Sequence, residues 1–364
     1  MLDFTSSQYL GLRHPFHALE PWTTFTLGGP AALVEPEGFK AVAHALARLQ
    51  GCERGVLAPS TLHLFWDLFG LLGDRRNAIY CDAGIYPIAR WGVERAAGKG
   101  AVVRFFSHHN PIALRQLMDG CERGTRPVVV ADGFCPACGS VAPLEEYLAC
   151  AREYGGVLVI DDTQALGIFG HSPGPAFPYG RDGGGVLRWS GIHGDDIMVI
   201  ASLAKGFGVP LAVLSGSSLM IRQFEKMSGT RVHCSPPSIA VVHVARRALA
   251  VNRQRGDELR LRLAMLVERF SRGVERAGLA TTSGIFPMQT LEETAAIDGI
   301  ALHAKLLRAG VRTVLQQAGR GGRGRVTLII SAFHDPLMVD RAVAALRRAA
   351  ADCRQAARGG VKWV

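Results

Sequence analysis

Long apolar runs are missing from this sequence. The longest apolar stretches, such as Ile197–Ala204 between Asp196 and Lys205, are far shorter than the roughly 20 residues that a membrane helix needs. The first residues, Met1–Thr5, carry an early acid and lack the basic-then-apolar pattern of a secretory leader. We therefore expect no membrane partner and a cytoplasmic location.

Cysteine is present but not in the pattern of a disulfide framework. The eight cysteines are scattered along 364 residues, whereas small secreted proteins concentrate theirs at regular spacings. The one C-x-x-C motif, Cys135–Cys138, has no second ligand pair of the kind that a structural zinc site requires. We predict no metal site and a tight loop after a strand at this motif, with a redox or metal function as the alternative.

Positive charge is in excess but is not concentrated. The chain has 41 Lys and Arg residues against 31 Asp and Glu residues, a net charge of +10. In residues 251–280, seven arginines alternate with four acids, and apolar residues fall between them at helical spacing. This pattern predicts a solvated helix face and no nucleic-acid partner. Attraction of an acidic substrate, such as CoA or an acyl carrier, remains the alternative.

The length allows two or three domains, and apolar runs followed by segments of helical period dominate the first 250 residues. Seven such runs are predicted to be buried strands: Gly55–Leu57, Ala78–Cys81, Val102–Phe106, Pro127–Ala131, Val157–Asp161, Ile197–Ala201 and Ala212–Leu214. Strands that alternate with helices indicate an α/β fold with a mainly parallel sheet covered by helices. Ligands bind beyond the carboxyl ends of such strands, so the residues after each run are the candidates for function.

The chain is predicted to have three parts. Residues 1–37 form an N-terminal arm, residues 38–251 a large domain, and residues 252–364 a smaller C-terminal α+β domain. The boundary is placed between two predicted helices, Ser238–Val251 and Leu259–Ala277. The Gly- and Pro-rich stretch His171–Gly185 is long for a loop of a compact domain, which indicates a lid or an insertion.

Three side chains at strand ends carry the chemical signal. Asp161 ends the run Val157–Asp161, and Ser202 and Lys205 follow the run that starts at Ile197. In a pyridoxal phosphate enzyme, a lysine holds the cofactor as a Schiff base, a carboxylate keeps the pyridine nitrogen protonated, and hydroxyl groups bind the phosphate. Each feature alone is weak, because a strand-end aspartate usually caps a helix. Their order along the chain points to pyridoxal phosphate.

At these residues the chain resembles the α-oxoamine synthases, which are fold-type I pyridoxal phosphate enzymes and include 8-amino-7-oxononanoate synthase and 2-amino-3-ketobutyrate CoA ligase. Four segments carry the resemblance: Phe4–Leu12 is similar to F-x-S-N-D-Y-L-G-L, Asp161–Gly167 to D-[DE]-A-H-x-x-G, Ser202–Lys205 to T-x-[GS]-K, and Ser235–Pro237 takes the place of S-x-P-P. The resemblance implies a large domain with a mainly parallel seven-stranded sheet, a smaller C-terminal α+β domain, and pyridoxal phosphate bound at Lys205.

The resemblance also implies the roles of residues at the cofactor. Asp161 would pair with the pyridinium nitrogen, and Ser202 would bind the phosphate. The phosphate loop of the family falls on Ser60 and Thr61, at the start of a predicted helix whose free N–H groups favour an anion. A plain helix cap is the alternative at Ser60. Tyr86 stands where the family has a histidine that stacks on the cofactor ring.

Further implied contacts involve the second subunit and the substrate. The family forms homodimers, and His233 or Ser235 would reach the phosphate site of the neighbouring subunit. Ser7 stands where the family has an asparagine near its N-terminus, and we predict that it contributes to substrate binding. His108 and His109 are predicted to form a structural turn.

Two departures affect the substrate. Gln164 replaces a family histidine; an amide can hydrogen-bond the cofactor hydroxyl or a substrate carbonyl but cannot carry a proton at neutral pH. Thr327 stands where the family has the arginine that grips the amino-acid carboxylate. Either Arg325 or Arg323 takes over that contact, or the amino substrate has no ordinary α-carboxylate there.

The expected reaction joins an amino acid to an acyl thioester, carried by CoA or an acyl carrier protein, and releases carbon dioxide to leave an aminoketone. Lys205 is the predicted general base. An aminotransferase that moves the amino group of a non-standard substrate is the alternative, because Tyr86 and Gln164 leave out the histidines of the acyltransferases.

Overall fold

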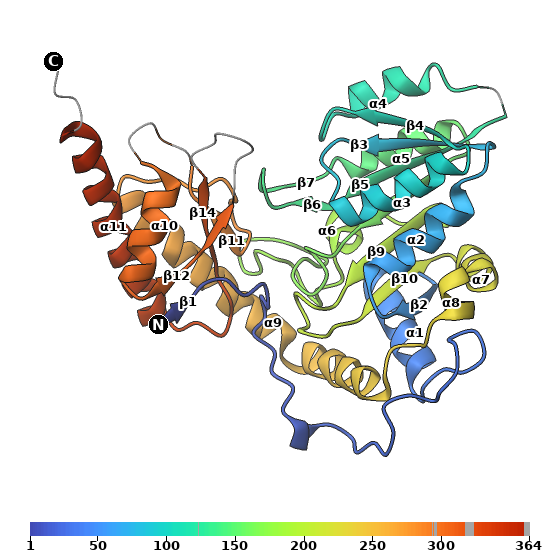
Figure 1. Ribbon diagram of the computed structural model, residues 1–364, viewed down its shortest axis with the longest axis horizontal. Coiled ribbons are helices and arrows are strands. Elements are labelled where there is room, and N and C mark those ends of the chain that lie inside the picture. Colours follow the sequence, from blue (N-terminus) through green and yellow to red (C-terminus); the bar gives the residue numbers. More distant parts are fainter. Residues whose placement is uncertain (123, 293, 295–296, 317–323, 360–364) are drawn as a thin grey trace. The chain divides into compact units, whose positions relative to one another are not determined.

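The computed structural model describes residues 1–122, 124–292, 294, 297–316 and 324–359 (Figure 1). The chain forms two compact units. The large unit comprises residues 12–135 and 141–257, and the small unit comprises residues 1–11, 136–140 and the chain from residue 258 onward. None of the helices in the described part of the chain is long and apolar enough to cross a membrane.

The large unit is built on a seven-stranded sheet with the order β2-β10-β9-β8-β5-β3-β4. Its strands are β2 (Arg54–Ala58), β3 (Asn77–Asp82), β4 (Val102–Phe106), β5 (Arg126–Asp132), β8 (Val157–Asp161), β9 (Ile197–Ser202) and β10 (Ala212–Gly216). Only β10 runs antiparallel to its neighbours among these seven. All seven predicted strands are therefore confirmed, as is the mainly parallel α/β sheet.

Helices connect most of these strands, as the alternating pattern predicts, and further helices lie before β2 and after β10. They are η1 (Phe16–Ala18), α1 (Phe39–Gln50), α2 (Thr61–Leu72), α3 (Pro87–Gly98), α4 (Pro111–Met118), α5 (Leu144–Glu153), α6 (Val186–Ser190), α7 (Ser218–Met227) and α8 (Gly229–His233). Pro87 and Pro111 begin α3 and α4, where a missing N–H costs nothing. Asn110 caps α4 by accepting the Ala113 N–H at 3.0 Å. The short strands β6 (Phe134–Cys135) and β7 (Ser140–Val141) pair with one another; Cys135 ends β6, and the rest of the C-x-x-C motif lies in the turn between them.

The parallel strands bring their carboxyl ends to one edge of the sheet. The register of β5 with β8 pairs Asp132 with Asp161, the last residue of each strand. Ser202 ends β9 and Asp82 ends β3. Because six of the seven strands point the same way, these polar residues gather at a single edge, as expected for this class of sheet.

One helix, α9 (Ile239–Arg276), replaces the two helices predicted around residue 252. The prediction of two helices was wrong, because the chain stays helical through the predicted boundary. Asn252 lies within this helix and donates from Nδ2 to the carbonyl of Asp182 at 2.8 Å. The intervening residues include no proline, and Gly256 costs a helix only about 1 kcal/mol. The two compact units divide within α9, after Asp257, whereas the sequence placed the boundary after residue 251.

The small unit combines strands and helices. The strand β1 (Leu2–Asp3) pairs in parallel with β12 (Val311–Arg312), and β11 (Met288–Thr290), β14 (Arg325–Ile329) and β13 (Val314–Gln316) form an antiparallel sheet. Its further helices are α10 (Gly299–Arg308) and α11 (Pro336–Gly359). Residues 1–11 of the predicted N-terminal arm therefore pack in the small unit, and residues 12–37 belong to the large unit.

Buried contacts hold the N-terminal residues in the small unit. The His334 ring stacks on Phe4 with 4.3 Å between the ring centres, and its Nε2 lies 2.8 Å from the Asp3 carbonyl oxygen. Nδ1 of the same ring accepts the Ser331 N–H at 3.1 Å. A neutral ring with its proton on Nε2 satisfies both bonds.

Candidate active site

Lys205 lies in the turn that follows β9 and is partly buried. Burial lowers the pKa of Lys205, and the charges of Asp161 and, more weakly, Asp132 act in the opposite direction. The net effect is a lowered pKa. An amine that loses its proton more readily is a better nucleophile toward an aldehyde.

Asp161 is held at the end of β8 by the residue two positions later. Its Oδ1 accepts the Thr163 N–H at 2.9 Å. Burial raises the pKa of Asp161, whereas the hydroxyl and N–H of Thr163 and the charge of Lys205 favour the anion. Thr163 also accepts the Ser202 N–H at its Oγ1, at 3.0 Å. The ends of β8 and β9 are thus fixed to one another beside Lys205.

The predicted phosphate-binding residues lie at the same edge. Ser202 Oγ accepts the Ala204 N–H at 3.2 Å in the turn that leads to Lys205. Ser60 precedes α2, and Thr61 is the first residue of that helix. Ser60 Oγ lies 2.9 Å from Nδ1 of His63 and makes no side-chain cap to the helix backbone. The first N–H groups of α2 are therefore not capped by Ser60, which favours the anion-binding interpretation of this helix end.

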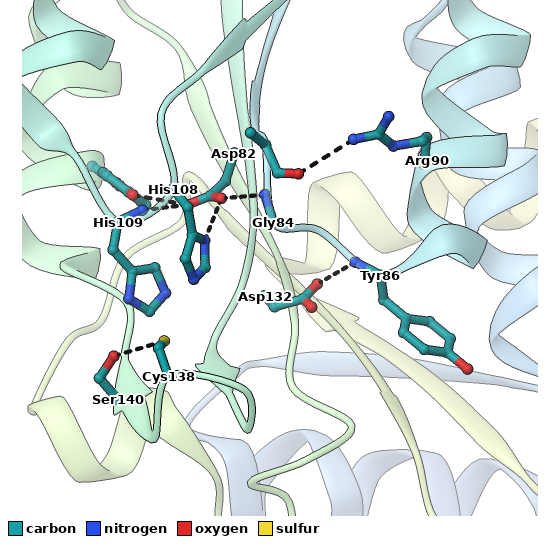
Figure 2. A network of polar contacts seen from close by, with 11 residues as sticks. Asp82, Gly84, Tyr86, Arg90, His108, His109, Asp132, Cys138 and Ser140 are labelled. Atoms are coloured by element: carbon teal, nitrogen blue, oxygen red, sulfur yellow. Dashed lines mark hydrogen bonds and ion pairs between the residues drawn. The ribbon is translucent and has the colours of Figure 1, made fainter. Parts of the chain in front are cut away.

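Tyr86 stands immediately before α3, and its ring is 55% exposed. Its N–H donates to Oδ1 of Asp132 at 3.3 Å, and its ring extends away from that carboxyl group (Figure 2). Gln164 is partly buried in the turn after Asp161, whereas His233 and Ser235 are exposed at the end of α8 and just beyond it. The roles assigned to these four residues remain predictions.

Asp132 was missed in the sequence analysis. It ends β5, pairs in register with Asp161, and its charge acts on Lys205. Burial, followed by the charge of Asp161, raises the pKa of Asp132 well above its usual value. The signal was present, because Asp132 directly follows the predicted strand Pro127–Ala131 just as Asp161 ends its own run.

Asp162, next to Asp161, has a different surrounding. Its side chain is buried and accepts the Val186 N–H at 3.2 Å, at the start of α6. Gly185 lies against the same carboxyl group with φ of +88°, and a β-carbon there would overlap Oδ2 of Asp162. Asp162 therefore fixes the loop before α6 and does not face Lys205 among the described interactions.

His108 and His109 form the predicted turn around a buried carboxylate. Asp82 accepts the Gly84 N–H at 2.8 Å, the His109 N–H at 3.0 Å and the Tyr147 hydroxyl at 3.0 Å, and His108 Nδ1 lies 2.6 Å from its Oδ1 (Figure 2). His109 adopts φ of +53° in this turn. Asp82 and the two histidines lie close enough to hold a metal ion, but four donors already engage the carboxylate.

The substrate-binding candidates Arg325 and Ser7 belong to the small unit. Arg325 begins β14 and lines a pocket of about 330 Å³ together with Leu279, Leu291 and Leu302. Thr327 is fully buried, and its Oγ1 lies 2.8 Å from that of Thr290. A hydroxyl so engaged inside the sheet does not replace an arginine that binds a carboxylate. The role of Arg325 therefore stays a prediction, and the alternative residue Arg323 lies outside the described residues.

The donor set of the large unit fits a phosphorylated aldehyde that carries a basic ring nitrogen. Lys205 supplies an amine of lowered pKa, and Asp161 supplies a fixed carboxyl group beside it. Hydroxyl groups and the first turn of α2 supply sites for a phosphate. Pyridoxal phosphate combines all three features.

Comparisons with known proteins agree with this chemistry. The sequence model of the family described as aminotransferase class I and II matches residues 2–346. An 8-amino-7-oxononanoate synthase of Pseudomonas aeruginosa is 27% identical over 341 residues, which cover 93% of this chain and 75% of the relative.

Solved structures show the same fold. A structure described as SPT with a PLP internal aldimine has a TM-score of 0.84 at 16% identity, covering 96% of this chain and 87% of that one. The serine palmitoyltransferase of Sphingomonas wittichii has a TM-score of 0.83 at 19% identity, with the same coverage. The predicted fold is thereby confirmed.

Proposed function

Because the chain belongs to the class I and II aminotransferase family, we propose that it is a pyridoxal phosphate-dependent acyltransferase of the α-oxoamine synthase type. The observation that carries the proposal is the placement of Lys205 beside Asp161 at the carboxyl edge of the sheet. The relatives named 8-amino-7-oxononanoate synthase and the structural neighbour named serine palmitoyltransferase support acyl transfer as the reaction.

In this proposal, different residues of the large unit bind different parts of the cofactor. Lys205 binds the aldehyde carbon through its amine, Asp161 holds a proton on the ring nitrogen, and Ser202, Ser60 and Thr61 bind the phosphate. Tyr86 covers one face of the ring with its exposed side chain. When bound, pyridoxal phosphate supplies an electron sink for the carbon that loses its proton.

Proton transfer falls to Lys205 in this proposal. The amine of Lys205 would accept the proton of the substrate Cα, and burial, which lowers the pKa of Lys205, favours the neutral amine that a general base requires. Gln164 hydrogen-bonds the cofactor hydroxyl or the substrate carbonyl but moves no proton.

The overall reaction balances as a condensation. A bond forms between Cα of the amino acid and the carbonyl carbon of the acyl thioester, and the thiol of CoA or of an acyl carrier protein leaves with a proton. The bond from Cα to the carboxylate then breaks and releases carbon dioxide, and Cα takes up a proton in place of the carboxylate to leave the aminoketone. In the proposal Arg325 binds the carboxylate of the amino acid, and Ser7 contributes to substrate binding.

A homodimer in the cytoplasm completes the proposal. Large apolar side chains of α2, α3 and the residue before α3 are exposed: Leu62 at 40%, Trp66 at 45%, Tyr86 at 55% and Trp91 at 49%. A second copy of the chain would cover them and place His233 or Ser235 at the neighbouring phosphate site. Sedimentation that finds only active monomer contradicts this part of the proposal.

The test has two steps. Borohydride treatment of the purified protein with pyridoxal phosphate should fix the cofactor to Lys205, as seen by peptide mass spectrometry, and Lys205→Ala should abolish the adduct. In the second step, protein with pyridoxal phosphate that has not been treated with borohydride is incubated with a panel of amino acids and acyl-CoA or acylated carrier protein. Release of free thiol and carbon dioxide supports the acyltransferase, whereas formation of a keto acid without thiol identifies the aminotransferase instead.

A further inference from the structure

Asp132 and Asp161 form a pair of carboxyl groups at one lysine. They end neighbouring parallel strands and are direct register partners, and neighbouring strands lie about 4.8 Å apart. The charge of Lys205 acts on both. Two carboxyl groups so close to one another and to a single ammonium group do not ionise independently.

Their surroundings differ in the number of hydrogen-bond donors. Asp161 receives two donors from Thr163, the N–H at 2.9 Å and the hydroxyl. Asp132 receives one, the Tyr86 N–H at 3.3 Å. Donors to a carboxylate stabilise its anion, so the negative charge is favoured on Asp161 and the proton on Asp132.

The other groups that face Asp132 act on its pKa in both directions. Burial and the charges of Asp161 on β8 and Asp82 on β3 raise the pKa of Asp132. The Tyr86 N–H and the charge of Lys205 lower it, and the net effect is strongly upward. This agrees with the asymmetry of the hydrogen bonds.

We propose that Asp132 is a positioning residue of the lysine site, which holds the backbone of Tyr86 and carries the proton that lets Asp161 remain an anion. The inference rests on the proposed function, because Tyr86 and Asp161 are the residues assigned to the cofactor ring. In an enzyme that uses a strand-end carboxylate as a permanent anion, a neighbouring carboxyl group that takes the proton prevents its neutralisation.

Two substitutions of Asp132 separate the proposal from a purely structural role. An amide has nearly the shape of a protonated carboxyl group, and its oxygen still accepts the Tyr86 N–H, so Asp132→Asn should keep both features. We expect its affinity for pyridoxal phosphate, measured by absorbance titration, to stay within about threefold of the wild type. Asp132→Ala loses the anchor of Tyr86 and should weaken binding about tenfold, the equivalent of one lost hydrogen bond. The matched control, Asp162→Asn, alters a buried carboxyl group that does not face Lys205 and should leave affinity unchanged.

The proton assigned to Asp132 can be measured in the cofactor-free protein through the pH dependence of stability. A carboxyl group that is protonated when folded and ionised when unfolded makes stability decline as pH rises. In urea unfolding between pH 4 and pH 7, the free energy of unfolding should decline less steeply with pH for Asp132→Asn than for the wild type. The difference in slope should correspond to at most one bound proton. An unchanged pH dependence overturns the proposal.

Two further outcomes also overturn it. If Asp132→Asn weakens cofactor binding as strongly as Asp161→Asn does, Asp132 acts as an anion. If Asp132→Ala folds and binds like the wild type, Asp132 does not position Tyr86. Failure of the wild type to form a borohydride-stable adduct at Lys205 would instead contradict the proposed function, while the count of protons in the cofactor-free protein would stand.

Discussion

Two regions differ in whether they retain the polar residues of the family. One is the carboxyl edge of the sheet in the large unit, and the other is the strand β14 of the small unit. At the edge, Asp161 and Ser202 stand at the expected strand ends, with Lys205 in the turn after β9, and Thr163 bonds both Asp161 and Ser202. On β14, the family's arginine position holds Thr327, whose hydroxyl is engaged with Thr290. The residues predicted to hold the cofactor's aldehyde, ring nitrogen and phosphate are retained, while the residue at the position of the substrate carboxylate is changed. Substrate identity can therefore differ from that of the relatives without any change in cofactor chemistry.

The largest effect is expected for the substitution Asp161→Asn, which tests the cofactor side of this comparison. The variant keeps the volume and one acceptor but removes the negative charge that holds the proton on the ring nitrogen. We expect turnover to fall on the order of 10³-fold or more, with a smaller loss of cofactor affinity because Ser60, Thr61 and Ser202 are untouched. Steady-state kinetics beside an absorbance titration measure both quantities, and a loss below tenfold in turnover would contradict the role of Asp161.

On the small unit, Arg325→Ala tests where the substrate carboxylate binds. A charged hydrogen bond is worth enough that KM for the amino substrate should rise on the order of 10- to 100-fold. The lysine–cofactor spectrum should not change, because Arg325 is not among the residues assigned to the cofactor. Unchanged kinetics would indicate an amino substrate without an ordinary α-carboxylate at that position.

The matched change two residues later, Thr327→Val, should act on stability alone. It leaves the Thr290 hydroxyl buried without its partner, which costs about 1–3 kcal/mol in the free energy of unfolding. Urea unfolding measures this loss, and KM for the amino substrate serves as the control. A rise of KM as large as that of Arg325→Ala would show that Thr327 contacts the substrate after all.

The smallest expected effect concerns His334 and pH. Burial lowers the pKa of His334, with the Asp3 carbonyl acting in the opposite direction. A base with a lowered pKa in the folded state adds stability that is present above the pKa of the unfolded chain, about 6.5, and is lost as pH falls. The free energy of unfolding should therefore fall as the pH is lowered from 7.5 to 5, by at most about 1.4 kcal/mol per pH unit.

Glutamine at position 334 offers the control for that measurement. His334→Gln keeps one donor and one acceptor but does not titrate, so its stability over this interval should be flatter than that of the wild type. Equal slopes for the two proteins would assign the pH dependence to other groups.

The sequence predicted the sheet well because its strands are continuous apolar runs, which a parallel sheet covered on both faces requires. It predicted Asp161 and Lys205 through their motifs. Asp132 carries no motif, and its importance depends on which strand lies beside β8, a matter of strand order that a single sequence does not specify. The course of α9 through Asn252 was missed for a related reason, because its contact with Asp182 joins residues 70 positions apart.

The pairing of β1 with β12 has a consequence during synthesis on the ribosome. Leu2 finds its partner in Val311, so the first strand to be made waits for one of the last. At a typical rate of about 5–20 residues per second, that wait lasts roughly 15–60 seconds. Throughout it, Phe4 and Tyr9, which are fully buried in the finished protein, remain exposed, and they are the first place where a nascent-chain chaperone would bind.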